Sequence, residues 1–171
     1  MQPEQALFLL QSTLPSLKNE MGITLKVLEA VPADKGDFRP DPVGKSAFEL
    51  AWHIAGAESL FLQAIVAGEF NFNNPRPDSV KTPKDVAEWY KVQSEKNLQQ
   101  LATLKGEQLV KVIDFRGMFQ NPAVTYMTFS LFHIIHHRGQ LSMYLRPMGA
   151  KVPAIYGESY DSAQAKKAAA Q

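Results

Sequence analysis

The segment from Phe129 to Leu141 contains three of the chain's four histidines, at positions 133, 136 and 137. We expect this segment to be helical. Residues four apart on an α-helix lie on one face about one turn apart, so the rings of His133 and His137 should point the same way. Two ligands of a single metal ion need this spacing. If the pair binds a metal, the element that supplies a further ligand must pack against this face, which constrains how the chain can fold.

A helical wheel of about 100° per residue separates the three histidines. Gln140 and Tyr144 fall, with His137, within about 40° of His133, whereas His136 lies about 60° away on the other side. We therefore interpret His136 as a flanking or interface residue. The remaining positions are apolar nearly all round, which is typical of a helix that is central in a bundle or covered by a second subunit.

Apolar residues recur at steps of three and four in four parts of the chain, which predicts an all-α fold. The predicted helices cover about residues 4–31, 46–67, 82–106 and 121–146. Helix-start signals support three of them. Ser46 and Glu49 form a capping box, while Thr82 and Asn121 are predicted N-caps because each is followed by proline. Pro15 is expected to kink the first helix without ending it.

The whole chain, residues 1–171, is expected to form one domain with its core over about residues 4–157. Between the third and fourth predicted helices lies a short β-like run, Leu109 to Phe115, followed by a turn at Gly117. We predict no regular structure there. The polar end of the chain, about residues 162–171, is expected to be frayed.

Composition excludes several classes of protein. The chain has no cysteine, which rules out disulfides, thiolate zinc sites and cysteine nucleophiles, so any reactive thiol must come from outside. Its 18 basic and 17 acidic residues are interspersed, so no nucleic-acid partner is expected. We find no signal-peptide pattern and no apolar run approaching the roughly 18 to 20 residues that span a bilayer. A cytoplasmic protein without a membrane partner is expected.

His53 lies in the middle of the second predicted helix, with Leu50, Ala57 and Leu60 around it on the wheel. A buried polar group without a partner costs about 1 to 3 kcal/mol, so this histidine needs one. A lone histidine is most often a satisfied core or surface residue, but an i, i+4 pair together with a third histidine on another apolar helix favours a metal site. Three protein ligands suit a catalytic site better than a structural one, which normally has four.

Other polar residues near the histidines are weaker candidates. Glu58 falls about 140° from His53 on the wheel, so we expect it at the surface. Arg138, Gln140 and Tyr144 are candidates for orienting a substrate, with a packing or surface role as the alternative. The HExxH, phosphate-loop and nucleophile-elbow motifs are absent from the sequence.

Four stretches of the sequence carry a family resemblance. They are Ser46 to His53 followed by Ile54-Ala55, the His133-x-x-x-His137 pair, the run His136 to Leu141, and Tyr144-Leu145-Arg146-x-x-Gly149-x-x-Val152-Pro153. In these features the chain resembles the DinB-like (DinB/YfiT-like) metal-binding family from about residue 4 to residue 157. The resemblance implies a four-helix bundle with an up-down-down-up course, often dimeric, that binds a divalent metal through His53, His133 and His137.

The resemblance also implies a function, because the same superfamily includes enzymes similar to metal-dependent transferases or isomerases that use bacillithiol, mycothiol or glutathione. Our first hypothesis is therefore a transferase that joins a low-molecular-weight thiol to a small electrophilic substrate. The alternatives are a noncatalytic, stress-associated metal-binding dimer and a bundle whose histidines only pack. Zinc or nickel is the expected metal, with iron and manganese as alternatives.

Overall fold

The computed structural model describes residues 1–170, so Gln171, the last residue of the predicted frayed end, lies outside the described residues. The described chain is mostly helical, which confirms the predicted all-α class. In chain order its elements are α1 (Pro3–Glu29), the short 3-10 helix η1 (Ala33–Lys35), α2 (Ala47–Ala67), α3 (Pro83–Ala102), α4 (Gly106–Leu109), β1 (Val112–Phe115), β2 (Phe119–Pro122), α5 (Thr125–Leu145) and α6 (Tyr160–Ala169).

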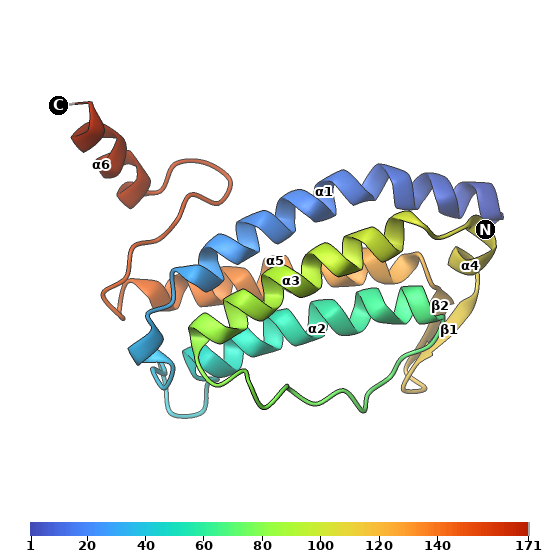
Figure 1. Ribbon diagram of the computed structural model, residues 1–171, viewed down its shortest axis with the longest axis horizontal. Coiled ribbons are helices and arrows are strands. Elements are labelled where there is room, and N and C mark those ends of the chain that lie inside the picture. The colour runs from blue at the N-terminus through green and yellow to red at the C-terminus, as the bar shows by residue number, and fades with distance from the viewer. Residues whose placement is uncertain (171) are drawn as a thin grey trace.

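Four long helices form the bundle, with α1 and α5 running in one direction and α2 and α3 in the other (Figure 1). Helix α1 contacts α3 and α5, and α2 contacts the same two helices. The loop of residues 68–82 carries the chain back along the bundle, so that α2 and α3 run parallel. This is the up-down-down-up course that the family resemblance implied.

The start of α2 is fixed by the predicted capping box. The Glu49 amide donates to the Ser46 hydroxyl over 3.2 Å, and the Ser46 amide donates to the Glu49 carboxylate over 2.8 Å. Thr82 caps α3 in the same way. At its other end α2 stops at Gly68, whose φ of 74° suits the left-handed conformation that glycine adopts without strain. These signals set which residues of α2 face the core.

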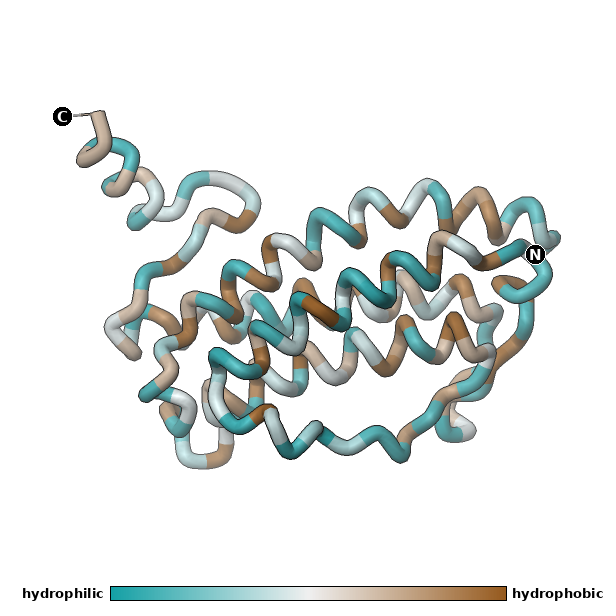
Figure 2. Tube along the Cα trace, viewed as in Figure 1, coloured by the Kyte–Doolittle hydropathy of each residue, from teal (hydrophilic) through white to brown (hydrophobic). Residues whose placement is uncertain are grey.

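Hydrophobic and hydrophilic residues alternate along the helices with the helical period (Figure 2). Each long helix contributes fully buried side chains to one core, among them Leu10, Leu17, Ile54, Leu62, Leu101, Ile134 and Leu141. Helix α2 is long and apolar enough to cross a membrane by length and composition, contrary to our expectation from the sequence. However, 56% of its apolar window is buried inside the bundle, because α2 packs between α3 and α5.

The predicted start of the last bundle helix at Asn121 is wrong. Residues 119 to 122 form β2, which pairs with β1 in an antiparallel hairpin where we predicted no regular structure. The Ala123 amide donates to the Lys111 carbonyl and the Val124 amide to the Leu109 carbonyl, so the backbone is committed to the hairpin until α5 begins at Thr125. The third helix likewise ends at Ala102, not Gly106.

The C-terminal segment also differs from the prediction. Residues expected to be frayed form α6, which projects away from the bundle (Figure 1) and has no buried residue. Ser159 caps this helix by accepting a hydrogen bond from the Ser162 amide, and the alanines and lysines that follow are good helix formers. Arg146 of the loop after α5 ties the start of α6 to the bundle through Asp161, 3.0 Å away.

Candidate metal centre

The three predicted ligands meet between α2 and α5. His53 Nε2 lies 3.1 Å from His133 Nε2 and 3.1 Å from His137 Nε2. All three potential ligand atoms lie within 4.8 Å of one another. The i, i+4 spacing on α5 places two of the rings on one face, and the packing of α2 against α5 brings the third opposite them.

Burial keeps these imidazoles neutral. It lowers the pKa of His53 to about 4, with the nearby charges of His137 and Lys45 as secondary causes. It lowers the pKa of His133 to about 4 as well, and it lowers that of His137 against the opposing effect of the hydrogen bond that His137 donates to Gln140. Neutral imidazole is the form that binds metal ions.

Gln140 holds one of the predicted ligands, His137, in the tautomer that metal binding requires. Its Oε1 atom lies 2.6 Å from His137 Nδ1, and an amide oxygen can only accept, so Nδ1 carries the proton. The Nε2 atom of His137 therefore presents a lone pair to the other two rings. Metal-ligating histidines are commonly oriented in this way, by a hydrogen bond from the ring nitrogen that does not bind the metal.

The donor set fits a metal ion better than it fits a hydrogen-bonded cluster. His53 Nε2 contacts two other ring nitrogens, yet a neutral ring carries at most one proton on that atom. One of the two contacts therefore has no hydrogen to share. A cation among the three nitrogens would engage all three lone pairs, and three imidazoles are a common ligand set for first-row metals.

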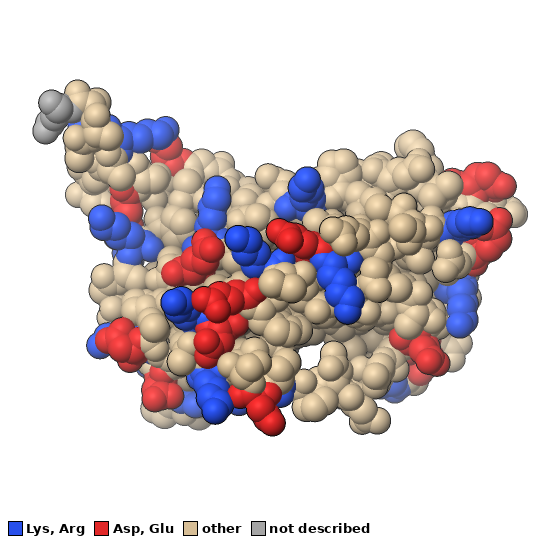
Figure 3. All heavy atoms as spheres, in the orientation of Figure 1, with Lys and Arg blue, Asp and Glu red and all other residues tan. Residues whose placement is uncertain are grey.

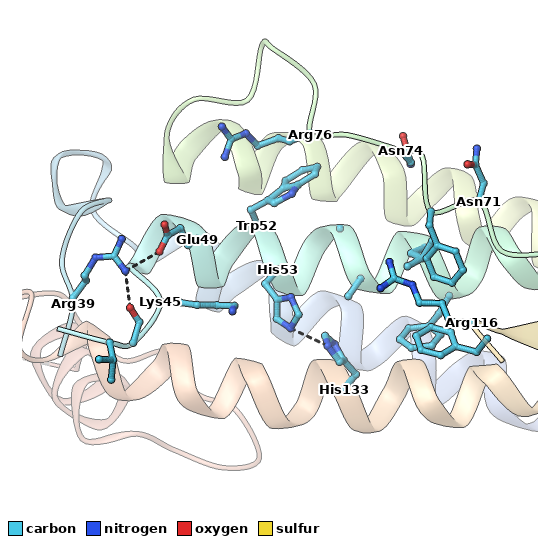
Figure 4. Close-up of a pocket in the computed structure, with 18 residues that line it drawn as sticks. Arg39, Lys45, Glu49, Trp52, His53, Asn71, Asn74, Arg76, Arg116 and His133 are labelled. Atoms are coloured by element: carbon cyan, nitrogen blue, oxygen red, sulfur yellow. Dashed lines mark hydrogen bonds and ion pairs between the residues drawn. The ribbon is translucent and has the colours of Figure 1, made fainter. Parts of the chain in front are cut away.

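The histidine cluster opens on a cavity of about 770 Å³, which His53 and His133 help to line. Its walls come from α2, from the loops around residues 39–45 and 71–76, and from the turn between β1 and β2 (Figure 4). Aromatic and aliphatic side chains supply the apolar part of the lining, namely Val43, Trp52, Leu60, Phe61, Phe72 and Phe115. A small molecule in this cavity therefore has direct access to the histidines.

An aromatic cluster fixes the hairpin against the cavity. Phe61 of α2 stacks on Phe115 of β1 with ring centroids 5.8 Å apart, and Phe70 packs edge-on against Phe115 at 5.0 Å. The Tyr126 hydroxyl at the start of α5 donates to the Ile113 carbonyl over 3.0 Å. The hairpin, which the sequence did not predict, is thereby held as one wall of the site.

The other candidates lie outside the histidine cluster. Arg138 is 1% exposed and pairs with Glu20 of α1 over 2.6 Å, so it lies in the interior on the α1 side. His136 is exposed, with its ring packed edge-on against His137, and lies outside the histidine cluster. Tyr144 donates from its hydroxyl to the Lys45 carbonyl over 3.3 Å, which steadies the loop before α2.

The prediction that Glu58 lies at the surface is wrong. Its side chain is 1% exposed and accepts a hydrogen bond of 2.7 Å from the Tyr90 hydroxyl. The wheel gave its direction relative to His53 but not its surroundings, and α3 covers the face on which it lies, through Tyr90. Sequence reasoning also missed Lys45 and Arg116, which line the cavity. The only available signal was the position of Arg116 beside the predicted turn at Gly117.

The fold and the site together define a class of protein: a helical bundle with three histidines from two antiparallel helices at the wall of a cavity. A sequence profile of the DinB family matches residues 5–168. The chain belongs to the DinB family. The uncharacterized protein YjoA of Bacillus subtilis (strain 168) is 30% identical over 130 residues, which cover 74% of this chain and 82% of YjoA.

Two solved structures show the same fold. The crystal structure of the DinB-like protein YjoA from Bacillus subtilis superposes with a TM-score of 0.72 at 26% identity, covering 86% of this chain and 99% of that one. A DinB-like protein from Bacillus cereus ATCC 10987 superposes with a TM-score of 0.73 at 24% identity, covering 85% and 97%. The bundle architecture is therefore shared with experimentally determined relatives.

Proposed function

We propose that His53, His133 and His137 hold a divalent transition metal and that the protein is a transferase joining a low-molecular-weight thiol to a small electrophile. The observation that carries this proposal is the convergence of three Nε2 atoms beside a cavity of about 770 Å³. Three protein ligands leave room for a further ligand from the cavity, as in catalytic sites. Zinc and nickel suit three imidazoles best, with iron and manganese as alternatives.

The chemistry divides between the bound metal and the chain's own residues. A divalent metal at this position would lower the pKa of a thiol that reaches it and so supply a thiolate. The sulfur then bonds to the electrophilic carbon, the leaving group departs with the bonding electron pair, and the thiol proton passes to solvent. The chain keeps His137 oriented through Gln140, and Trp52, Phe61 and Phe115 provide apolar walls around the reactants.

A noncatalytic metal-binding role is the second candidate, and one observation favours it. Among the described residues, Glu49 is the only carboxylate that lines the cavity, and it is already bound to the Ser46 amide and to Arg39. The cavity walls therefore offer no free carboxylate to act as a general base. In this reading the metal ties α2 to α5 and stabilises the bundle.

The experiment that separates these functions begins with protein purified without a histidine tag. Elemental analysis is expected to find about one equivalent of a transition metal, and His53→Ala should lose both the metal and its stabilisation of the fold. Less than about a tenth of an equivalent in the wild type, with an unchanged melting temperature for His53→Ala, would overturn the metal site.

Turnover is measured next, with bacillithiol, mycothiol or glutathione and a generic electrophile. The transferase is expected to act with at least one thiol, and His137→Ala should lower kcat/KM by about 100-fold or more. Equal rates for the wild type and His137→Ala with every thiol would exclude the transferase and favour the noncatalytic, structural role of the metal.

We further propose that the protein acts in the cytoplasm as a homodimer. The absence of cysteine fits a reducing compartment. The outer face of α5 supports the dimer, because Phe132 and Met143 are 69% and 75% exposed there. Between them on that face lie His136 and Gly139, so no lysine, arginine or carboxylate interrupts it.

A further inference from the structure

The cavity beside the histidines is much more basic than the rest of the molecule. The whole chain carries a formal net charge of +1, and Figure 3 shows acidic and basic side chains interspersed on one face. The cavity lining, by contrast, has one carboxylate, Glu49, and four cationic side chains, which are Arg39, Lys45, Arg76 and Arg116. Positive charge is therefore gathered at this one site.

Two of these cations are not available beside the histidines. Arg39 pairs with Glu49 over 2.9 Å, and Arg76 lies over the ring of Phe48, with Trp52 between it and His53 (Figure 4). Across residues 1–170, neither Lys45 nor Arg116 forms an ion pair with a carboxylate. These two side chains keep their charge available to a ligand in the cavity.

Arg116 adopts an unfavourable backbone conformation. Its φ is 55° and that of Gly117 is 70°, and the Met118 amide donates to the Phe115 carbonyl over 3.0 Å. A turn with two positive φ values prefers asparagine, aspartate or glycine at its first central position. Arginine pays a steric cost there. Backbone strain at a residue beside a ligand cavity indicates a function when the strained conformation directs the side chain into that cavity.

The strained turn delivers the Arg116 side chain to the cavity. Its guanidinium lies over the Phe72 ring, 4.2 Å from the centroid, which holds it in place along the wall. Lys45 is held at the other side, because its carbonyl accepts a hydrogen bond from Tyr144 and the next residue caps α2. Figure 4 shows Lys45 and Arg116 on opposite sides of His53 and His133.

We propose that the cavity selects a thiol with a carboxylate on each side of its sulfur, and that Lys45 and Arg116 bind the two carboxylates. This inference rests on the proposed function, since it places the sulfur at the three histidines. A guanidinium binds a carboxylate through two parallel hydrogen bonds, and an ammonium binds it as a point charge. Arg116 is thus a specificity-determining residue.

The test uses zinc-loaded protein, with the zinc content checked first, and calorimetric titration with two probes. Glutathione carries a carboxylate on each side of its sulfur, while glutathione diethyl ester has the same skeleton without those charges. We expect the wild type to bind glutathione about 10-fold or more tightly than the ester, with a preference that weakens as salt is added.

Three variants assign the preference to its residues. Arg116→Asn should weaken glutathione binding about 10-fold and leave the ester nearly unchanged, whereas Arg116→Lys should retain part of the preference. Lys91→Asn, on the exposed face of α3, is the control and should bind like the wild type. Because asparagine tolerates positive φ, Arg116→Asn should melt at the same or a higher temperature, which a purely structural role for Arg116 does not predict.

The outcomes distinguish this inference from the function on which it rests. Equal affinity of the zinc-loaded wild type for glutathione and the ester would overturn the carboxylate preference and leave the metal-dependent thiol function standing. An unchanged preference in Arg116→Asn would overturn the role of Arg116. Failure to take up zinc, or to bind either thiol when loaded, would overturn both the inference and the proposed function.

Discussion

At the scale of single residues, the least expected side chain is Glu58. Burial raises its pKa to about 8, against the opposing hydrogen bonds from Tyr90 and Ser94. The same burial, together with the adjacent Glu58, raises the pKa of Tyr90 well above its usual value. At neutral pH the pair is therefore uncharged, so α2 and α3 are joined by a neutral hydrogen bond.

The raised pKa of Glu58 predicts a pH-dependent stability. In the unfolded chain this carboxyl ionises near its ordinary value, so between that value and about 8 the folded state binds the extra proton. The contribution of Glu58 is therefore complete at low pH and is lost as the pH rises through about 8. As the pH rises from about 4.5 to about 8 the free energy of unfolding should therefore lose this contribution, by up to about 1.4 kcal/mol per pH unit for one proton, and the loss should level off above about pH 8.

Urea unfolding at several pH values in this range checks the expectation. Glu58→Gln should flatten the decline, whereas Glu95→Gln, which removes an exposed carboxylate from α3, should leave it as in the wild type. Parallel declines in the wild type and Glu58→Gln would mean that Glu58 is ionised in the folded protein.

The clustering of the three histidines was predictable at this scale. Helical phase placed His133 and His137 on one face and left His136 outside. The cost of burying an unpaired polar group called for a partner for His53, the family resemblance named the three together, and the structure brings these three rings together. Phase cannot say which element covers a given face. Glu58 was misplaced for that reason, since its angle from His53 was known but the presence of α3 on that side was not.

At the scale of secondary-structure elements, helix caps were predicted where they act locally and failed where strand pairing competed. Ser46 and Thr82 begin helices as expected. Asn121 and Pro122 carry an equally good cap signal, but both residues are paired with β1. The pairing depends on residues about ten positions away, so a local rule does not detect it. The Asn-Pro signal was therefore overridden by the hairpin.

Two glycines, Gly22 of α1 and Gly106 of α4, should respond oppositely to alanine. Gly22 lies inside α1 with no atom within 4 Å of where a Cβ would stand, whereas a Cβ on Gly106 would lie 2.3 Å from the Pro3 carbonyl oxygen. Gly22→Ala should therefore raise the free energy of unfolding by about 0.5 to 1 kcal/mol. Gly106→Ala should lower it by about 1 to 3 kcal/mol, because the start of α1 and α4 must separate.

Urea unfolding of both variants and the wild type measures these changes with the same substitution in each case. A loss of stability in Gly22→Ala would show that helix propensity does not govern that position. No loss in Gly106→Ala would show that α4 can move away from α1 at little cost.

At the scale of the whole molecule, the four apolar stripes and the family resemblance predicted the bundle, but they did not predict the positive charge of the cavity. Lys45 and Arg116 come from segments that are far apart in the sequence and unremarkable there. They become a pair of cations around the histidines only when the loop before α2 and the hairpin are placed against the bundle. Charge that is interspersed along the chain is thereby concentrated in one site.

The outer face of α5 leads to a prediction about assembly. A face that pairs with itself across a two-fold axis must be compatible with its own copy, and an apolar face without charged residues meets that condition. We expect sedimentation velocity to show a dimer, and Phe132→Glu to shift it to a monomer because like charges would meet at the interface. Each monomer should keep its metal, since all three histidines belong to one chain.

The matched control for this prediction is Val92→Glu, because Val92 of α3 is 69% exposed, as Phe132 is. It should remain dimeric, since it lies outside α5. A wild type that sediments as a monomer at every concentration, or a Val92→Glu variant that dissociates as readily as Phe132→Glu, would contradict the assignment of this face. His136 lies beside His137 on α5, so a second copy on this face could also support the histidine site. Loss of metal when the dimer dissociates would show that it does.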